Sequence, residues 1–142
     1  MKGMAVLLDT NVPLDSFFDR EPFRENAQKI LTLCRERKCK GFVAAHSLTN
    51  IFYILRKNWT TAKRKELLLD LCDIVQVAGI DRIKLVEALQ NEDFDDIEDG
   101  LQVECAAAVN ADYIITRDMR DFENSPIPGI LPEDFLKLFD GE

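Results

Sequence analysis

Two carboxylates stand directly behind apolar segments of the chain. The run AVLL at residues 5–8 leads into Asp9, and the apolar run in DYIITRD is followed shortly by Asp118. A buried ionised carboxylate is normally held by hydrogen bonds or by a metal ion, because an unpaired buried charge is costly. If both acids reach one edge of a sheet, they repel each other unless a cation or a shared proton lies between them. If they meet, the two acids therefore indicate either a cation or a shared proton between them.

A local alternative exists for the first acid. Asp9, Thr10 or Asn11 could cap a helix that begins near Val12, with Pro13 tolerated in its first turn. A capping side chain would be satisfied by backbone N–H groups and would need no cation. These residues alone leave both alternatives open.

A third group of acids lies in the segment DFDDIEDG. Asp96 is placed to cap the following helix, with Glu98 and Asp99 near the helix's positive end. One helix end does not need all the carboxylates of this segment, which are Asp93, Asp95, Asp96, Glu98 and Asp99. Three or more carboxylates in one pocket favour an oxygen-binding cation such as Mg²⁺ or Mn²⁺.

Strands and helices that alternate along the chain must position these acids. We expect strands at 5–8, 41–45 and 74–79 and an apolar strand within 112–118. We expect helices near 12–18, 23–37, 47–57, 62–73 and 81–90 and a helix that follows the acids within 93–111, with a loop at 124–132 before a short helix at 133–139. This order predicts a parallel sheet with helices on both faces. Right-handed crossovers carry every strand's carboxyl end to the same edge, where such sheets bind ligands. We therefore expect one α/β domain spanning residues 1–142.

The composition limits the function further. The net charge of −8 argues against a domain that grips nucleic acid by general electrostatics, although bound cations would make an acidic site far less negative. The four cysteines form no CxxC pair and His46 is the only histidine, so zinc is not expected. No apolar run has the length of a membrane span and the N-terminus is unlike a signal peptide, so we expect no membrane partner and a cytoplasmic location.

Three ordered segments resemble a known family. The segments LLDTN, DFDDIEDGLQ and ADYIITRDMRDF, in this order and spacing, resemble the PIN-domain nucleases, and TNIFYILRK is similar to the matching helix of the VapC-type toxin branch. The resemblance covers nearly the whole chain. It implies a three-layer α/β/α sandwich with a central five-stranded parallel sheet. It also implies a Mg²⁺- or Mn²⁺-dependent ribonuclease, which could be the toxin of a toxin–antitoxin pair with an antitoxin protein as partner.

The resemblance assigns roles residue by residue. It makes Asp9, Asp99 and Asp118 the catalytic, metal-binding acids. It gives supporting positions to Thr10, Asn11, Asn50, Asp96, Thr116 and Asp121.

One position departs from the family pattern. The family's second acid is usually a glutamate in the helix after the second strand, and Asn50 stands there in SLTNIFYILRK. An amide oxygen can coordinate a hard cation, but it supplies no charge and cannot act as a base. The alternative function is therefore a degenerate PIN domain that binds RNA or a protein without cutting. A phosphatase or receiver domain is disfavoured, because LDTN lacks the second Asp of DxDx[TV] and no lysine follows YIITRD.

Basic residues offer contacts for an RNA backbone. Arg117 and Arg120 flank Asp118 and could touch substrate phosphates, or they could be local ion-pair partners. The basic runs at 35–40 and 56–65 could guide RNA, or they could be solvated surface. Apolar helix surfaces would also favour a homodimer.

Overall fold

The computed structural model describes residues 3–139, and its centre is a five-stranded parallel sheet. The strand order is β3-β2-β1-β4-β5, and the strands are β1 (Ala5–Leu8), β2 (Lys40–Ala44), β3 (Gln76–Ala78), β4 (Tyr113–Ile115) and β5 (Gly129–Ile130). The predicted α/β class and five parallel strands are confirmed. The outermost ends of the expected 1–142 domain, residues 1–2 and 140–142, lie outside the described residues.

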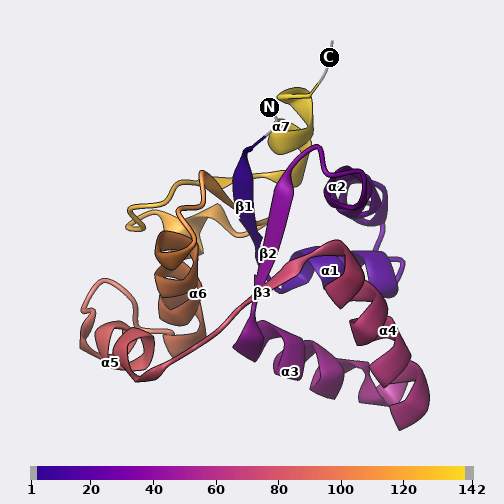
Figure 1. Ribbon diagram of the computed structural model, residues 1–142, viewed down its shortest axis with the longest axis horizontal. Coiled ribbons are helices and arrows are strands. Elements are labelled where there is room, and N and C mark those ends of the chain that lie inside the picture. Colours follow the sequence, from indigo (N-terminus) through magenta and orange to yellow (C-terminus); the bar gives the residue numbers. More distant parts are fainter. Residues whose placement is uncertain (1–2, 140–142) are drawn as a thin grey trace.

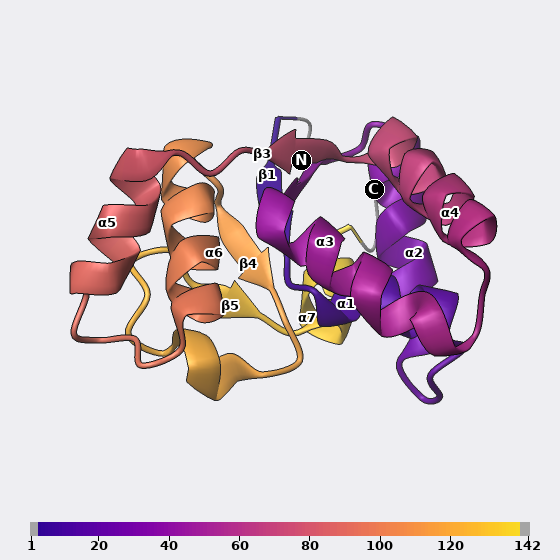
Figure 2. The ribbon, with the colours of Figure 1, turned by 90° about the horizontal axis from the view of Figure 1, so that it is seen from below.

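Helices cover both faces of this sheet, as Figures 1 and 2 show. The helices are α1 (Asn11–Phe17), α2 (Arg24–Arg35), α3 (Ala45–Ile54), α4 (Thr61–Ile74), α5 (Arg82–Gln90), α6 (Ile97–Ala108) and α7 (Pro132–Lys137), with 3-10 turns η1 (Leu55–Lys57) and η2 (Met119–Phe122). Helices α5 and α6 lie on one side of the sheet, and α1, α2 and α4 lie on the other (Figure 1). No helix within residues 3–139 has the length and apolar character needed to cross a lipid bilayer.

The first strand is apolar throughout because both of its faces are buried. Val6 and Leu8 pack into the cluster formed with α2 and α4, whereas Ala5 and Leu7 pack into the cluster formed with α6. Alternate residues of a strand point to opposite faces, so a strand between two helical layers has no polar positions. This strand is the middle of the sheet and fixes the position of whatever follows it.

Strands β1 and β4 are neighbours, as the shared-site interpretation requires. Leu8 of β1 is paired with Ile115 of β4, and the Asp9 N–H donates to the Ile115 carbonyl at 3.0 Å. The chain moves from β1 to β2 on one side and later returns to β4 on the other, so the strand order switches beside β1. In open α/β sheets this switch point is where ligands bind.

Two local predictions were wrong. The segment 124–132, expected to be a loop, contains strand β5, which is only two residues long and flanked by prolines, so it has no strand periodicity. Helix α3 was expected to open at Ser47, but it begins at Ala45 directly after β2 and has no side-chain cap. Ser47 is instead fully buried within the helix.

Candidate functional site

A small pocket lies at the carboxyl edge of the sheet, beside the switch point. Its volume is about 180 Å³, and its lining residues are Asp9, Thr10, Asn11, Leu14, Asn50, Ile54, Glu98, Asp99, Gln102, Asp118 and Asp121. A larger hollow of about 680 Å³ lies between α2 and α7, where charges of both signs alternate on the surface. We place the chemistry in the smaller pocket because the predicted acids converge there. We call it the acid pocket.

Asp9 is almost completely buried and is held by neutral donors. Its Oδ1 accepts hydrogen bonds from the Thr10 backbone N–H at 2.7 Å and from Gln102 Nε2 at 2.9 Å. Its Oδ2 accepts from Thr116 Oγ1 at 2.8 Å. The capping alternative is wrong, because α1 has no side-chain cap and Asp9 contacts only the backbone N–H of the residue next to it, while its other contacts are with the neighbouring strand and α6.

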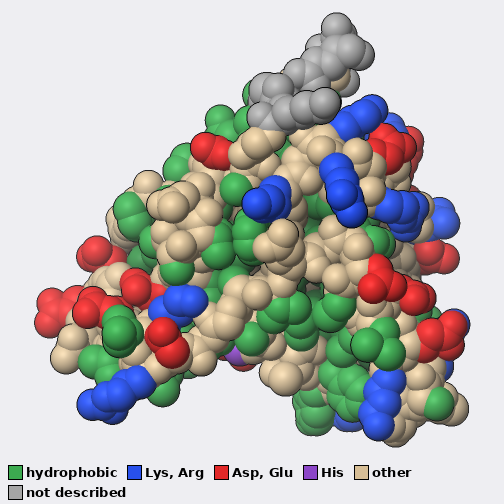
Figure 3. Space-filling view, viewed as in Figure 1, with side chains coloured by type: hydrophobic (Ala, Val, Ile, Leu, Met, Phe, Trp, Pro, Cys, Tyr) green, Lys and Arg blue, Asp and Glu red, His purple; other side chains and the backbone are tan. Residues whose placement is uncertain are grey.

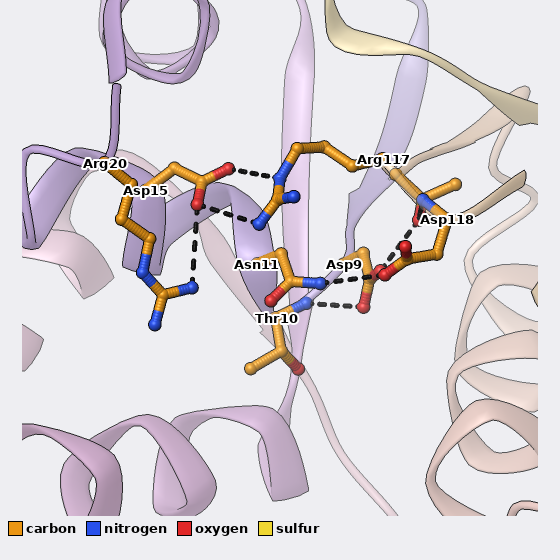
Figure 4. A network of polar contacts seen from close by, with 8 residues as sticks. Asp9, Thr10, Asn11, Asp15, Arg20, Arg117 and Asp118 are labelled. Carbon is orange, nitrogen blue, oxygen red and sulfur yellow. Dashed lines mark hydrogen bonds and ion pairs between the residues drawn. The ribbon is translucent and has the colours of Figure 1, made fainter. Parts of the chain in front are cut away.

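Asp118 is connected to the same network, as Figure 4 shows. Asn11 Nδ2 donates to Asp118 Oδ2 at 3.1 Å. Thr116 Oγ1 accepts from the Asp118 backbone N–H at 2.9 Å while it donates to Asp9. A single buried hydroxyl therefore holds the Asp9 carboxylate through its proton and the Asp118 backbone through its lone pair.

Asp99 enters the pocket from the first turn of α6. Asp96 caps this helix by accepting from the backbone N–H groups of Glu98 and Asp99 at 2.8 Å and 3.2 Å, as expected from the sequence. Burial, as the larger cause, and the negative charges of Asp96, Asp121, Asp9 and Glu98 together raise the pKa of Asp99 to about 7.

Asp121 lies at the mouth of the pocket on η2. Partial desolvation raises its pKa, and the charges of Asp118, Asp9 and Asp96 act in the same direction. Two carboxyl groups of this pocket thus hold their protons more tightly than free aspartic acid does. In both groups burial is the larger cause, and the neighbouring negative charges add to it.

Asn50 also lines the pocket, from α3. The helix is held against β1 by the Thr10 hydroxyl, which donates to the buried Ser47 Oγ at 2.8 Å. Ser47 lies three residues before Asn50, so the same side of α3 that anchors the helix presents the amide to the acids. The placement of the second motif beside the other acids agrees with the sequence prediction.

The donor set suits a hard divalent cation. Carboxylate and amide oxygens are the ligands that Mg²⁺ and Mn²⁺ prefer, and among the described residues the lining of the pocket includes no lysine or arginine. Within residues 3–139 no three His, Cys, Asp or Glu side chains already stand in the arrangement of a formed metal centre.

The two candidate arginines lie outside the acid pocket. Arg117 donates to Asp15 from Nε at 2.7 Å and from Nη2 at 3.1 Å, and its guanidinium lies over the Phe23 ring at 4.0 Å. This geometry favours the ion-pair alternative for Arg117 over contact with substrate. Arg120 is exposed on η2 and borders a separate surface hollow with Met119.

A family model described as PIN domain matches residues 5–120 of this sequence. The chain belongs to the PIN domain family. A search of curated proteins gives no significant match.

Several solved structures share the fold of this PIN domain. VapBC2 from Rickettsia felis, bound to a DNA fragment from their promoter, superposes with a TM-score of 0.69 at 14% identity and covers 90% of this chain and 98% of that chain. VapC20 of Mycobacterium tuberculosis, a toxin that cleaves the sarcin-ricin loop, gives a TM-score of 0.66 at 11% identity, covering 86% and 95%. FitAcB from Neisseria gonorrhoeae gives a TM-score of 0.65 at 17% identity and covers 90% of this chain and 98% of that chain. At such low sequence identities, the structural similarity establishes a shared fold and nothing more specific.

Two residues of the site were missed by the sequence interpretation. Gln102 follows Asp99 by one helical turn in EDGLQ, and that spacing alone could have placed it on the same face. Asp15 is 1% exposed, and nothing in its sequence context signals a buried ion pair with a residue more than one hundred positions away.

Proposed function

We propose that this PIN domain is a ribonuclease that uses Mg²⁺ or Mn²⁺ in the acid pocket to hydrolyse RNA phosphodiester bonds. The observation that carries this proposal is the charge of the pocket. Asp9, Asp99, Asp118 and Asp121 converge in about 180 Å³, and within the described chain the pocket lining includes no lysine or arginine. Such a site attracts cations from solution, and a cation held there can bind a phosphate.

Asp9, Asp99 and Asp118 are the proposed cation ligands and catalytic residues. Asn50 adds an amide oxygen, and Thr10, Asn11, Asp96, Thr116 and Asp121 support the ligands as described above. When bound, the cation would lower the pKa of a water molecule and stabilise charge on the phosphate.

The chain's own residues do the positioning. Thr116 holds Asp9 Oδ2 and the Asp118 backbone, and Asn11 holds one oxygen of Asp118, which leaves the other oxygen free. Asp96 fixes the first turn of α6, so Asp99 stays at the pocket wall. These contacts keep the ligands near their working positions before substrate arrives, which is how positioning lowers a barrier.

A cationic hollow beside the acid pocket supports an RNA backbone as the substrate. This hollow of about 460 Å³ is lined by Phe18, Arg20, Ile54, Arg56, Lys57 and Asn58, and Ile54 also lines the acid pocket. The two hollows are therefore neighbours on the surface. On the face drawn in Figure 3 acidic side chains lie beside α5 and also on the side of α2 and α4, where basic side chains lie among them.

The proposed biological context is a toxin with an antitoxin partner in the cytoplasm. The support is the fold shared with VapC20, which is a toxin, and with VapBC2, which was solved on promoter DNA. A homodimer remains a proposal that no described contact addresses.

The second candidate is a PIN domain that binds RNA or protein without cleaving it. Asn50 favours it, because the amide brings no negative charge to the cation. Incubating the purified chain with labelled single-stranded and stem-loop RNA in Mn²⁺, Mg²⁺ or EDTA separates the two functions. We expect cleavage with either cation, none in EDTA, and none by Asp9→Asn. RNA binding without cleavage under every cation would support the second candidate.

The cationic hollow has its own variant and control. Arg56→Gln should weaken RNA binding without changing Mn²⁺ affinity, whereas Lys29→Gln on the distant helix α2 removes the same charge and should change neither. Equal RNA affinities for both variants would mean that the backbone does not cross this hollow.

A further inference from the structure

Gln102 is a buried amide that faces the carboxylates of the acid pocket. Only 2% of the residue is exposed, and it lines the pocket together with Asp99, which lies three residues earlier on α6. Residues three apart on a helix lie on the same side. A buried amide usually has partners for both its oxygen and its nitrogen.

The orientation of this amide is fixed by its neighbour. Gln102 Nε2 donates to Asp9 Oδ1 at 2.9 Å, and an ionised carboxylate can only accept. The NH₂ group must therefore face Asp9, and Oε1 must face elsewhere. Oε1 is buried and has no hydrogen-bond partner among residues 3–139. A buried acceptor without a donor is unfavourable, so this atom calls for a ligand that supplies one.

The hydrogen bonds of Asp9 also determine which of its oxygens remains available. Oδ1 already accepts from the Thr10 N–H and from Gln102, whereas Oδ2 accepts only from Thr116. Each carboxylate oxygen has two lone pairs. Gln102 therefore occupies the last lone pair of Oδ1 and leaves one on Oδ2.

We propose that Gln102 is a positioning residue of the cation site. Its Nε2 turns the free lone pair of Asp9 Oδ2 toward the cation, and its Oε1 accepts a hydrogen bond from a water molecule in the cation's hydration shell. Gln102 and Asn50 together supply amide oxygens to the cation site, which lacks the glutamate usual at the position of Asn50. This inference rests on the proposed function, because it takes a divalent cation as the ligand of the acid pocket.

A residue that only packs in the interior would behave differently. Replacing it would change the melting temperature of the cation-free protein but not the additional stabilisation that Mn²⁺ brings. A positioning residue changes that additional stabilisation and the Mn²⁺ affinity. Loss of a residue that orients a metal ligand typically weakens metal binding about tenfold or more.

The experiment is a calorimetric titration with Mn²⁺ alone, together with melting curves with and without Mn²⁺. Gln102→Met keeps the length of the side chain and removes both polar atoms, so we expect the dissociation constant for Mn²⁺ to rise about tenfold. Gln102→Glu keeps an acceptor and adds charge, so it should bind Mn²⁺ at least as tightly and melt lower without it. Gln28→Met, on the exposed side of α2, is the matched control and should match the wild type.

Each outcome decides between the proposals. Wild-type Mn²⁺ affinity in Gln102→Met, with binding lost in Asp9→Asn, would overturn the role of Gln102 and leave the proposed function standing. Equal Mn²⁺ binding by the wild type and Asp9→Asn would overturn the proposed function and this inference together. If circular dichroism shows Gln102→Met unfolded, Gln102→Asn takes its place, because the shortened amide cannot keep both contacts and should weaken Mn²⁺ binding in the same way.

Discussion

Asp9 and Asp15 are two buried aspartates only six residues apart, and the protein treats their charges differently. Asp15 is 1% exposed and receives two hydrogen bonds from the Arg117 guanidinium, with Arg20 at 3.7 Å. Asp9 is 6% exposed and receives hydrogen bonds only from neutral groups within the described chain. Figure 4 shows both carboxylates on either side of Asn11. The charge of Asp15 is neutralised inside the protein, whereas the charge of Asp9 is oriented by hydrogen bonds but not neutralised.

The same short segment after β4 serves both carboxylates. Thr116 bonds to Asp9, Arg117 bonds to Asp15, and Asp118 joins Asp9 in the acid pocket. A charge that is paired internally contributes to structure, and a charge that is left unpaired beside others is available to an external cation. The difference between the two aspartates is therefore the physical basis for assigning a function to one of them and a structural role to the other.

The largest expected effect follows from removing a charge in the acid pocket. Asp9→Asn and Asp118→Asn keep the size of the side chain, and each should lower RNA cleavage by about 100-fold or more, since a metal ion contributes several kcal/mol to such reactions. Stability should change little, because Thr116 Oγ1 can turn to accept from the new amide. Cleavage rates at limiting Mg²⁺ measure the effect. Wild-type rates in both variants would mean that these acids are structural.

The corresponding change at the paired aspartate should act on stability. Asp15→Asn leaves two guanidinium groups without their carboxylate and should cost about 2–3 kcal/mol of unfolding free energy, less than a fully buried pair because Arg117 keeps 23% of its side chain exposed. Urea unfolding measures the loss. Asp19→Asn is the control, because Asp19 pairs with Arg24 at the surface and should cost almost nothing. Equal stability of the two variants would remove the contrast between Asp9 and Asp15.

A smaller effect is expected from adding a charge to the acid pocket. Asn50→Glu should lower the Mn²⁺ concentration needed for half-maximal cleavage roughly tenfold, which needs only about 1.4 kcal/mol of added attraction. The same charge should lower the melting temperature of the cation-free protein, because it adds to the repulsion among the acids. Titrating Mn²⁺ while following cleavage and melting tests both. No change in either would mean that residue 50 does not act on the site.

A further effect is expected in the pH dependence of the cation-free protein. The folded-state pKa of Asp99 is raised to about 7, so the folded protein holds this proton more tightly than the unfolded chain does. The associated stability is present below about pH 4 and is lost as the pH rises toward about 7. Asp99→Asn should flatten this part of the stability profile measured by urea unfolding. A profile identical to that of the wild type would mean that Asp99 is not crowded by the other acids.

The sequence was sufficient for the sheet and for the acids at its edge. Apolar strands with no polar alternation predicted burial on both faces, and the position of Asp9 and Asp118 behind two such strands predicted their meeting, which the pairing of Leu8 with Ile115 confirms. Strand β5 was missed because a two-residue strand in a proline-rich segment carries no periodic signal. A strand can be predicted when its apolar pattern extends over several residues, and it is missed when the strand is too short to show a pattern.

The hydrogen-bond network of the site could not be predicted in the same way. The partner of Arg117 is Asp15, and the partner of Gln102 is Asp9, which lies 93 residues away. Such pairs depend on how α1, α6 and β4 pack, and nothing in the local sequence encodes the choice between substrate contact and ion pair for an arginine. The catalytic roles of the acids remain predictions.

The most direct test of the cation site is anomalous diffraction from crystals of this protein soaked in Mn²⁺. The account predicts an anomalous peak in the acid pocket, within coordination distance of carboxylate oxygens from Asp9, Asp99 and Asp118, and no peak beside Asp15. A pocket without anomalous density at saturating Mn²⁺, or Mn²⁺ bound beside Asp15 in its place, would contradict the claim that the unpaired carboxylates form a divalent-cation site.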